Sequence, residues 1–231
     1  MTEPEPTKVE PAQIAKLRAV LPERGRVFIV PHNHPDPDAL ASAAGMHLLL
    51  DRQFGLSGQI VFTGQISRAE NRALLRHYRY KWRPISQVRT PARPVPAILV
   101  DTSPWSGNVN IPSWVEPVAV IDHHPLRKPK REAEAMFTDI RTGAGASATM
   151  VYEYLRKCDI TLPKWLATVM TYAIATETMD LSRDCSDADL EAYVELLTKG
   201  NLQILGKIRH APLGRTYYAH LQEAMERARM F

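Results

Sequence analysis

Four short apolar runs, separated by helical stretches, constrain the fold of this chain more than any other feature of its sequence. The runs cover residues 27–30, 59–62, 97–100 and 118–121, and glycine or proline lies close to each. They are rich in β-branched residues and do not alternate apolar with polar positions, which is typical of strands buried on both faces of a parallel sheet. We therefore expect an open α/β sheet with right-handed crossovers.

Helical periodicity appears between the runs and then dominates the second half of the chain. Residues 38–50 and 67–79 separate the first three runs. After about residue 145 the pattern predicts mostly helix, over residues 146–156, 163–175, 186–197, 202–209 and 214–229. We expect a disordered, acidic and proline-rich lead-in over residues 1–12, followed by one domain over 13–231 that is α/β to about 145 and helical after it.

Composition excludes several classes of protein. Hydrophobic residues make up 45% of the chain, which is ordinary for a folded protein, and no apolar stretch approaches the roughly 20 residues of a membrane span. The N-terminus lacks the basic and apolar regions of a secretory signal. The two cysteines, Cys158 and Cys185, are far apart, which argues against a disulfide framework and against a cysteine zinc site. We expect a cytoplasmic protein with no membrane partner.

The charge is uneven along the chain. The net charge is +4, and residues 68–93 hold eight basic residues but one acid, Glu70. Three of the arginines, Arg68, Arg72 and Arg76, recur every four residues and share one helix face. The basic excess is compatible with a negatively charged substrate, and a solvated basic face explains it equally well. For the three arginines, a solvated face is the better interpretation.

Ionisable residues follow three of the four predicted strands. They are His32, Asp36 and Asp38 after the first, Asp101 after the third, and Asp122, His123 and His124 after the fourth. The carboxyl ends of parallel strands share one edge, where ligands bind, so we expect these side chains to converge. Crowded carboxylates need cations, and imidazole with carboxylate suits Mn²⁺ or Mg²⁺. Two such ions sharing a carboxylate favour hydrolysis of a phosphate ester or anhydride.

Each residue also has a simpler interpretation. His32 could be a surface loop residue, and Asp36 a turn former. Asp38 could cap the following helix, and Asp101 could cap a turn. Because all three groups fall at predicted strand ends, a common site is the better interpretation.

The ordered set His32-x-x-x-Asp36-x-Asp38, Asp101 and Asp122-His123-His124 resembles the DHH phosphoesterase superfamily, over about residues 27–218. The first motif is most similar to the branch of nanoRNA oligoribonucleases and pAp phosphatases. Exonucleases, cyclic-dinucleotide phosphodiesterases and family II pyrophosphatases belong to the same superfamily. The resemblance implies a DHH catalytic domain that hydrolyses short oligonucleotides or nucleotide phosphates (nanoRNA, pApA, pAp) with two Mn²⁺ ions, or with Mg²⁺ or Co²⁺.

The resemblance also implies a set of metal ligands. His32 and Asp36 would hold the first ion, and Asp38 and His123 the second. Asp101 would bridge the two ions.

Other roles follow from the same resemblance. Asp122 would orient the histidine pair, and His124 would touch the scissile phosphate or protonate the leaving oxygen. Glu177 stands where the superfamily has an aspartate ligand of the second metal. Asp180, three residues later, is a rival ligand.

A second group of candidates lies on the substrate side. The stretch from Arg141 through Gly143 and Gly145 to Ser147 precedes a helix, whose N-terminal N–H groups can hold an anion. Glycines for a tight turn and Ser147 as a helix cap are an equally good explanation. Arg68 and Arg72 could contact nucleotide phosphates. The basic segment 127–131 could frame the mouth of the site.

The superfamily usually has a second, C-terminal domain with a Gly-Gly-Gly-His-like motif, and no such motif occurs in this sequence. We therefore expect weak substrate binding and a tendency to form a homodimer. Two alternatives stay open: a pyrophosphatase or polyphosphatase, and a metal- or nucleotide-binding remnant without catalysis.

Overall fold

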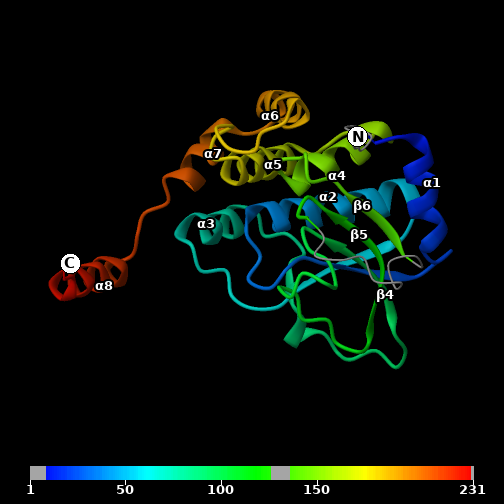
Figure 1. The fold of residues 1–231 in the computed structure, drawn as a ribbon, viewed down its shortest axis with the longest axis horizontal. Coiled ribbons are helices and arrows are strands. Elements are labelled where there is room, and N and C mark those ends of the chain that lie inside the picture. Colours follow the sequence, from blue (N-terminus) through cyan, green and yellow to red (C-terminus); the bar gives the residue numbers. More distant parts are fainter. Residues whose placement is uncertain (1–8, 126–135, 230–231) are drawn as a thin grey trace.

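A six-stranded, all-parallel sheet forms the centre of the molecule, with the strand order β3-β2-β1-β4-β5-β6 (Figure 1). The computed structural model describes residues 9–125 and 136–229; the predicted lead-in up to residue 8 and the basic segment 127–131 lie outside these ranges. The strands are β1 (Arg26–Val30), β2 (Ser57–Phe62), β3 (Arg83–Pro84), β4 (Val95–Val100), β5 (Val115–Asp122) and β6 (Phe137–Ile140).

Helices account for most of the remaining described chain. They are α1 (Pro11–Val20), α2 (Pro37–Phe54), α3 (Ala69–His77), α4 (Ser147–Lys157), α5 (Lys164–Glu177), α6 (Asp187–Lys199), α7 (Leu202–Arg209) and α8 (Arg215–Arg227), with a short 3-10 helix at Ile85–Gln87. Helix α8 has no buried residue and stands away from the rest of the molecule (Figure 1). Among the helices of the described ranges, none is both long and apolar enough to cross a bilayer.

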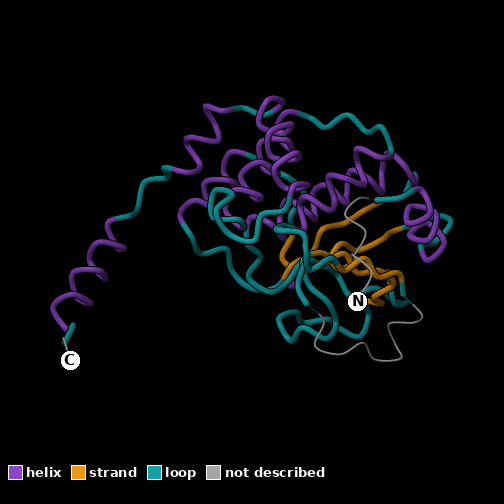
Figure 2. The backbone as a smooth tube through the Cα atoms, turned by 45° about the horizontal axis from the view of Figure 1, so that its top comes forward, coloured by secondary structure: helices purple, strands orange, loops and turns teal. Residues whose placement is uncertain are grey.

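The two faces of the sheet are covered differently. On one face, Ile29, Ile98 and Ile121 pack into the main core with α2, α4 and α5. On the other face, Phe28, Leu99 and Val120 pack beneath loops that contribute side chains such as Ile111 and Trp114. Figure 2 shows helices gathered above the strands and loops below them. Burial on both faces explains why the strands read as continuous apolar runs.

The predicted α/β class is confirmed, as are the sheet flanked by helices and the helical C-terminal part. Strands β3 and β6 were not predicted, because β3 has two residues and the sequence of β6, Phe-Thr-Asp-Ile, is half polar. The last four residues of the predicted lead-in, 9–12, are folded in the structure. Helix α1 begins at Pro11, and Val9 before it is 4% exposed, so residues 9–12 belong to the folded part.

Candidate metal centre

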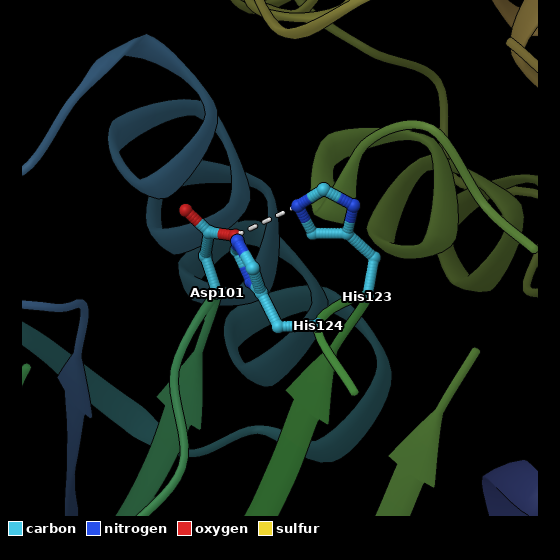
Figure 3. Close-up of side chains that lie close together, drawn as sticks. All are labelled: Asp101, His123 and His124. Carbon is cyan, nitrogen blue, oxygen red and sulfur yellow. Dashed lines mark ion pairs between the residues drawn. The ribbon is translucent and has the colours of Figure 1, made fainter. Parts of the chain in front are cut away.

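Asp101 is the central residue of the predicted site and directly follows β4. Its backbone has a φ of 58°, in the left-handed region that non-glycine residues avoid, and its N–H donates to the carbonyl of Ile121 over 2.9 Å. The side chain is buried, with one carboxylate oxygen 3.5 Å from His32 Nε2 and the other 3.4 Å from His123 Nε2. The strained turn thus directs the carboxylate between the imidazoles of His32 and His123. Figure 3 shows the His123 side of this arrangement.

His32 and Asp36 lie on one side of Asp101, in the loop between β1 and α2. The ring Nδ1 of His32 donates to the carbonyl of Asn33 over 2.8 Å, which leaves Nε2 facing Asp36 Oδ1 at 3.7 Å. Asp36 also caps α2, because the same oxygen accepts a hydrogen bond of 3.0 Å from the N–H of Ala39. The cap fixes the carboxylate beside the histidine.

Asp38 lies on the other side and is completely buried. Its two carboxylate oxygens accept hydrogen bonds of 2.7 Å from the N–H groups of Ser147 and Ala148, at the N-terminus of α4. One of them also lies 3.8 Å from His123 Nε2. Asp38 therefore joins α4 to the metal centre, whereas the capping of α2 that it could have provided is done by Asp36.

His123 completes the centre with one ring nitrogen unpaired. Its Nδ1 donates to the carbonyl of Ala144 over 3.2 Å, so Nε2 points at Asp101 and Asp38. This Nε2 is one of four buried side-chain polar atoms with no hydrogen-bond partner in the described part of the chain. A buried polar atom without a partner is costly, and a cation would satisfy it.

These residues fit a divalent cation. The separations of 3.4–3.8 Å between imidazole nitrogens and carboxylate oxygens exceed an ordinary hydrogen bond. They suit two donors that each lie about 2.1 Å from one shared ion. Two groups have donor atoms that all lie within 4.8 Å of one another: His32 with Asp36 and Asp101, and Asp101 with His123 and His124. Asp101 belongs to both groups, and its predicted bridging role stays a prediction.

The charges of the centre are strongly coupled. Burial opposes the charged ring of His32, but the carboxylates of Asp101 and Asp36 raise its pKa to about 11. Burial likewise opposes charge on His123, while Asp101 and Asp38 raise its pKa to about 10. For Asp101, burial is outweighed by the two imidazoles, which hold its pKa below the ordinary range. A proton and a cation compete for each Nε2, so metal binding releases protons.

His124 and Asp122 form a separate pair at the end of β5. Asp122 Oδ1 accepts from the backbone N–H of His124 at 3.1 Å and from its ring Nδ1 at 2.9 Å. This hydrogen bond with Asp122 raises the pKa of His124. These side-chain hydrogen bonds of Asp122 are thus with His124, whereas the ring of His123 is held by the carbonyl of Ala144.

Of the two rival ligands on the fourth motif, Glu177 faces the centre. Burial and the nearby carboxylates of Asp36 and Asp101 raise the pKa of Glu177, the last residue of α5. Asp180 is 75% exposed and pairs with Arg209 over 2.8 Å. Arg183, which the sequence analysis missed, donates to the Glu177 carbonyl over 2.9 Å and holds the end of α5 in place.

The predicted substrate-side residues before α4 face the interior. Ser147 is buried, and its hydroxyl donates to Asp101 Oδ1 over 3.1 Å. The N–H of Gly145 donates to Asp189 over 2.7 Å. Because Asp38 and Asp189 occupy these N–H groups, the helix N-terminus binds the protein's own carboxylates rather than an external anion. Of the two glycines in this stretch, Gly143 has open space around it and Gly145 does not.

Arg141 is also placed away from the substrate side that we expected. Its guanidinium makes a bidentate pair with Asp139, at 2.8 and 2.9 Å, and a third bond of 2.5 Å with Glu153. Tyr154 donates to the same Asp139. Arg141, Asp139 and Glu153 are ionisable residues of opposite charge, and all four residues, Tyr154 included, are buried. We call Arg141, Asp139, Glu153 and Tyr154 the Arg141 cluster.

Arg68 and Arg72 lie at the start of α3, and both are exposed. Arg68 is the N-cap residue, and the Arg72 guanidinium donates to the carbonyl of Ser67. Their predicted contact with substrate stays a prediction.

The candidate metal centre lies at the carboxyl edge of a parallel sheet, and comparison with known proteins identifies the family. The profile of the DHH family, N-terminal domain, matches residues 26–174. The chain belongs to the DHH family.

Three similar proteins illustrate the range of the family. An uncharacterized protein of Methanocaldococcus jannaschii is 26% identical over 208 residues, which are 90% of this chain and 42% of that protein. A protein of Streptococcus mutans named as a probable manganese-dependent inorganic pyrophosphatase is 24% identical over 75% of this chain and 55% of its own length. The crystal structure of an exopolyphosphatase-related protein from Bacteroides fragilis aligns with a TM-score of 0.74 at 14% identity, over 98% of this chain and 68% of that one. The chain spans about half the length of the curated relatives it matches.

Proposed function

We propose that this protein is a metal-dependent phosphoesterase that hydrolyses phosphodiester or phosphomonoester bonds in short oligonucleotides or nucleotide phosphates. The observation that carries the proposal is the position of Asp101, which is buried and shared by two groups of metal-ligand donors. Mn²⁺ is the cation that we propose, in two sites, since the donors are imidazoles and carboxylates without thiolate. Manganese also appears in the names of several relatives.

The residues of the centre have distinct tasks in this proposal. His32, Asp36, Asp38, Asp101, His123 and Glu177 would hold the cations. When bound, the cations supply positive charge to the phosphate oxygens and make a water molecule more acidic. In hydrolysis of a diester, the water oxygen forms a new bond to phosphorus while the bond from phosphorus to the leaving oxygen breaks.

We propose that His124 completes this step. Asp122 holds its Nδ1, and half of the side chain is exposed, which leaves Nε2 open toward a substrate. In our proposal, Nε2 gives a proton to the leaving oxygen, so pApA and one water yield two molecules of AMP.

A pyrophosphatase is the second candidate. The relatives from Streptococcus mutans and Enterococcus faecalis are both named as probable manganese-dependent inorganic pyrophosphatases. The same centre can serve either substrate, because the chemistry at phosphorus is the same.

A substrate panel tests the proposal. We would measure AMP release from pApA, phosphate release from pAp, and phosphate release from pyrophosphate, each with Mn²⁺ and with a chelator. We expect Mn²⁺-dependent hydrolysis of pApA or pAp that exceeds hydrolysis of pyrophosphate. Hydrolysis of pyrophosphate alone would replace the proposal by the second candidate, and no hydrolysis of any of them would contradict both.

A further inference from the structure

His34 is exposed, yet it is held in one orientation by several independent contacts. Its backbone has a φ of 55°, and its N–H donates to the carbonyl of Thr63 over 2.8 Å. The ring Nδ1 accepts a hydrogen bond of 2.9 Å from the N–H of Gln65. The ring also lies flat against Gly64, where an added Cβ would come within 2.6–2.7 Å of three ring atoms.

This arrangement is not explained by packing. A left-handed backbone costs a non-glycine residue about 1–2 kcal/mol, and an exposed side chain gains little from burial in return. His34 also lies outside both groups of metal-ligand donors found among the described residues. Fixed and strained residues of this kind cluster where a ligand binds.

The ring presents a hydrogen-bond donor to solvent. The Nδ1 atom lies 2.9 Å from the Gln65 N–H and 3.3 Å from the Gln65 carbonyl. When Nδ1 accepts the shorter of these two bonds, the ring hydrogen is carried by Nε2, on the side away from that loop. A fixed N–H donor loses little conformational entropy when it binds a ligand, and phosphate oxygens are strong acceptors for it.

The position of His34 relative to the metal centre follows from the sheet. The contacts with Thr63 and Gln65 place it over the end of β2, which lies next to β1 and two places from β4. Neighbouring strands are about 4.8 Å apart, so the end of β2 is about 5 Å from the strand that carries His32 and about 10 Å from the strand that carries Asp101. One substrate molecule can reach both places.

The N-terminus of α3, which follows this strand end in the chain, carries positive charge. Arg68, the N-cap of α3, lies four residues after Gly64, and the helix begins at the next residue. The Arg72 guanidinium turns back to the carbonyl of Ser67, at the same end of the helix. Glu70 is the one acid in the first turn of α3. Two guanidiniums and the positive end of the helix dipole outweigh this single carboxylate.

We propose that His34, together with Arg68, forms a subsite for a second, non-reacting phosphate of the substrate. This inference rests on the proposed function and narrows it to substrates in which a nucleoside separates two phosphates. The two phosphorus atoms of pyrophosphate share one oxygen, so both would lie at the metal centre and leave His34 without a ligand. In pApA, the 5′-terminal phosphate is separated from the scissile diester by a whole nucleoside, which fits the spacing between β2 and β4.

The first experiment compares two substrates that differ in one phosphate. We would measure kcat and KM for pApA and for ApA with Mn²⁺, using the wild-type protein and His34→Ala. The control is His77→Ala, which changes a different exposed histidine, at the end of α3. We expect the wild type and the control to prefer pApA at least about tenfold in kcat/KM. In His34→Ala, we expect kcat/KM for pApA to fall about tenfold, mainly through KM, so that the preference disappears.

Three outcomes would overturn the inference. A wild-type protein that cleaves both dinucleotides equally well has no subsite for the terminal phosphate, although the proposed function stands. An equal loss on both substrates in His34→Ala would mean that the ring supports the metal centre. A wild type that cleaves pyrophosphate and neither dinucleotide would remove the proposed function, and the inference with it.

A second measurement does not depend on turnover. The imidazole signal of His34 Nε2–H, assigned with His34→Gln, would be followed by NMR in the presence of a chelator while adenosine 3′,5′-bisphosphate is added. We expect this signal to shift and the His77 signal to stay in place. Gly64→Ala should abolish the shift, because the added Cβ displaces the ring. An unshifted His34 signal in the wild type at millimolar ligand would contradict the inference.

Discussion

Two buried groups of charged residues lie at the carboxyl end of the sheet, and they differ in how their charges are spaced. In the Arg141 cluster, guanidinium nitrogens lie 2.5–2.9 Å from carboxylate oxygens. In the metal centre, the Nε2 atoms of His32 and His123 lie 3.4–3.8 Å from the aspartate oxygens. The first distances are those of direct ion pairs, whereas the second leave room for an ion between the donors.

The comparison shows why charge and burial alone do not identify a site. Both groups combine basic and acidic side chains in the interior. In the Arg141 cluster the guanidinium meets the two carboxylates directly, so the opposite charges compensate one another without a ligand. Each group keeps one buried atom without a hydrogen-bond partner in the described part of the chain, Glu153 Oε1 in the cluster and His123 Nε2 in the metal centre. The spacing between opposite charges therefore separates the two groups better than unpaired atoms do.

The largest expected effect is loss of hydrolysis when the shared carboxylate is removed. Asp101→Ala takes a donor from both groups at once, so we expect Mn²⁺-dependent turnover to fall by about ten-thousandfold, or about 5.5 kcal/mol in the barrier. Steady-state rates on the best substrate of the panel measure it. Asp51→Ala, at an exposed position of α2, is the control and should keep normal rates. Turnover that survives in Asp101→Ala would remove this residue from the bridging position.

The next effect concerns stability rather than turnover. Arg141→Met leaves the carboxylates of Asp139 and Glu153 buried without their partner, so we expect a loss of about 3–5 kcal/mol in the free energy of unfolding. Urea denaturation with a chelator present measures it. Arg156→Met removes a half-exposed guanidinium 3.7 Å from Glu195 and should cost less than about 1 kcal/mol. If both variants lose equally little, the Arg141 cluster is not the structural ion pair that we describe.

Added Mn²⁺ should separate the two groups in a single measurement. At a free concentration of about 100 Kd, a ligand that binds only the folded state stabilises it by about 2.7 kcal/mol. We expect this gain in the wild type and in Arg141→Met, because the cluster does not bind the ion. Asp101→Ala should show little of it. A gain that persists in Asp101→Ala would place the metal elsewhere on the chain.

The fold could be predicted where local sequence decides the structure. Strands β1, β2, β4 and β5 were found because each contains a continuous apolar run. Strand β6 has alternating burial and a polar sequence, so its place in the sheet depends on pairing with β5 rather than on its own composition. The two residues of β3 carry no periodic signal at all.

The site shows the same division. Its residues could be placed at one edge because the strand ends of a parallel sheet converge. The occupants of the α4 N-terminus could not be predicted, since Asp38 and Ser147 are 109 residues apart and only the folded chain brings them together. The same is true of Arg141, whose partner Glu153 lies on α4.

The smallest expected effect is a pH dependence of stability that comes from His47, a buried histidine outside both groups. His47 accepts a hydrogen bond of 2.8 Å from the Tyr80 hydroxyl, and burial together with Lys81 lowers its pKa. In the unfolded chain the ring titrates near 6.5, so below that pH the unfolded state binds more protons. The stability that the neutral ring contributes is therefore complete above pH 6.5 and is lost as the pH falls below it.

The metal centre behaves in the opposite sense. The raised pKa values of His32 and His123 contribute stability that is complete below pH 6.5 and is lost as the pH rises toward about 10–11. The free energy of unfolding of the wild type and of His47→Gln, measured with a chelator at pH 7.5 and 5.5, isolates the contribution of His47 to stability. We expect the advantage of the wild type over the variant to shrink by at most about 1 kcal/mol at the lower pH. If the advantage of the wild type grows at the lower pH instead, His47 is charged in the folded protein. His47 would then titrate in the same sense as the histidines of the metal centre, and the contrast between them would be wrong.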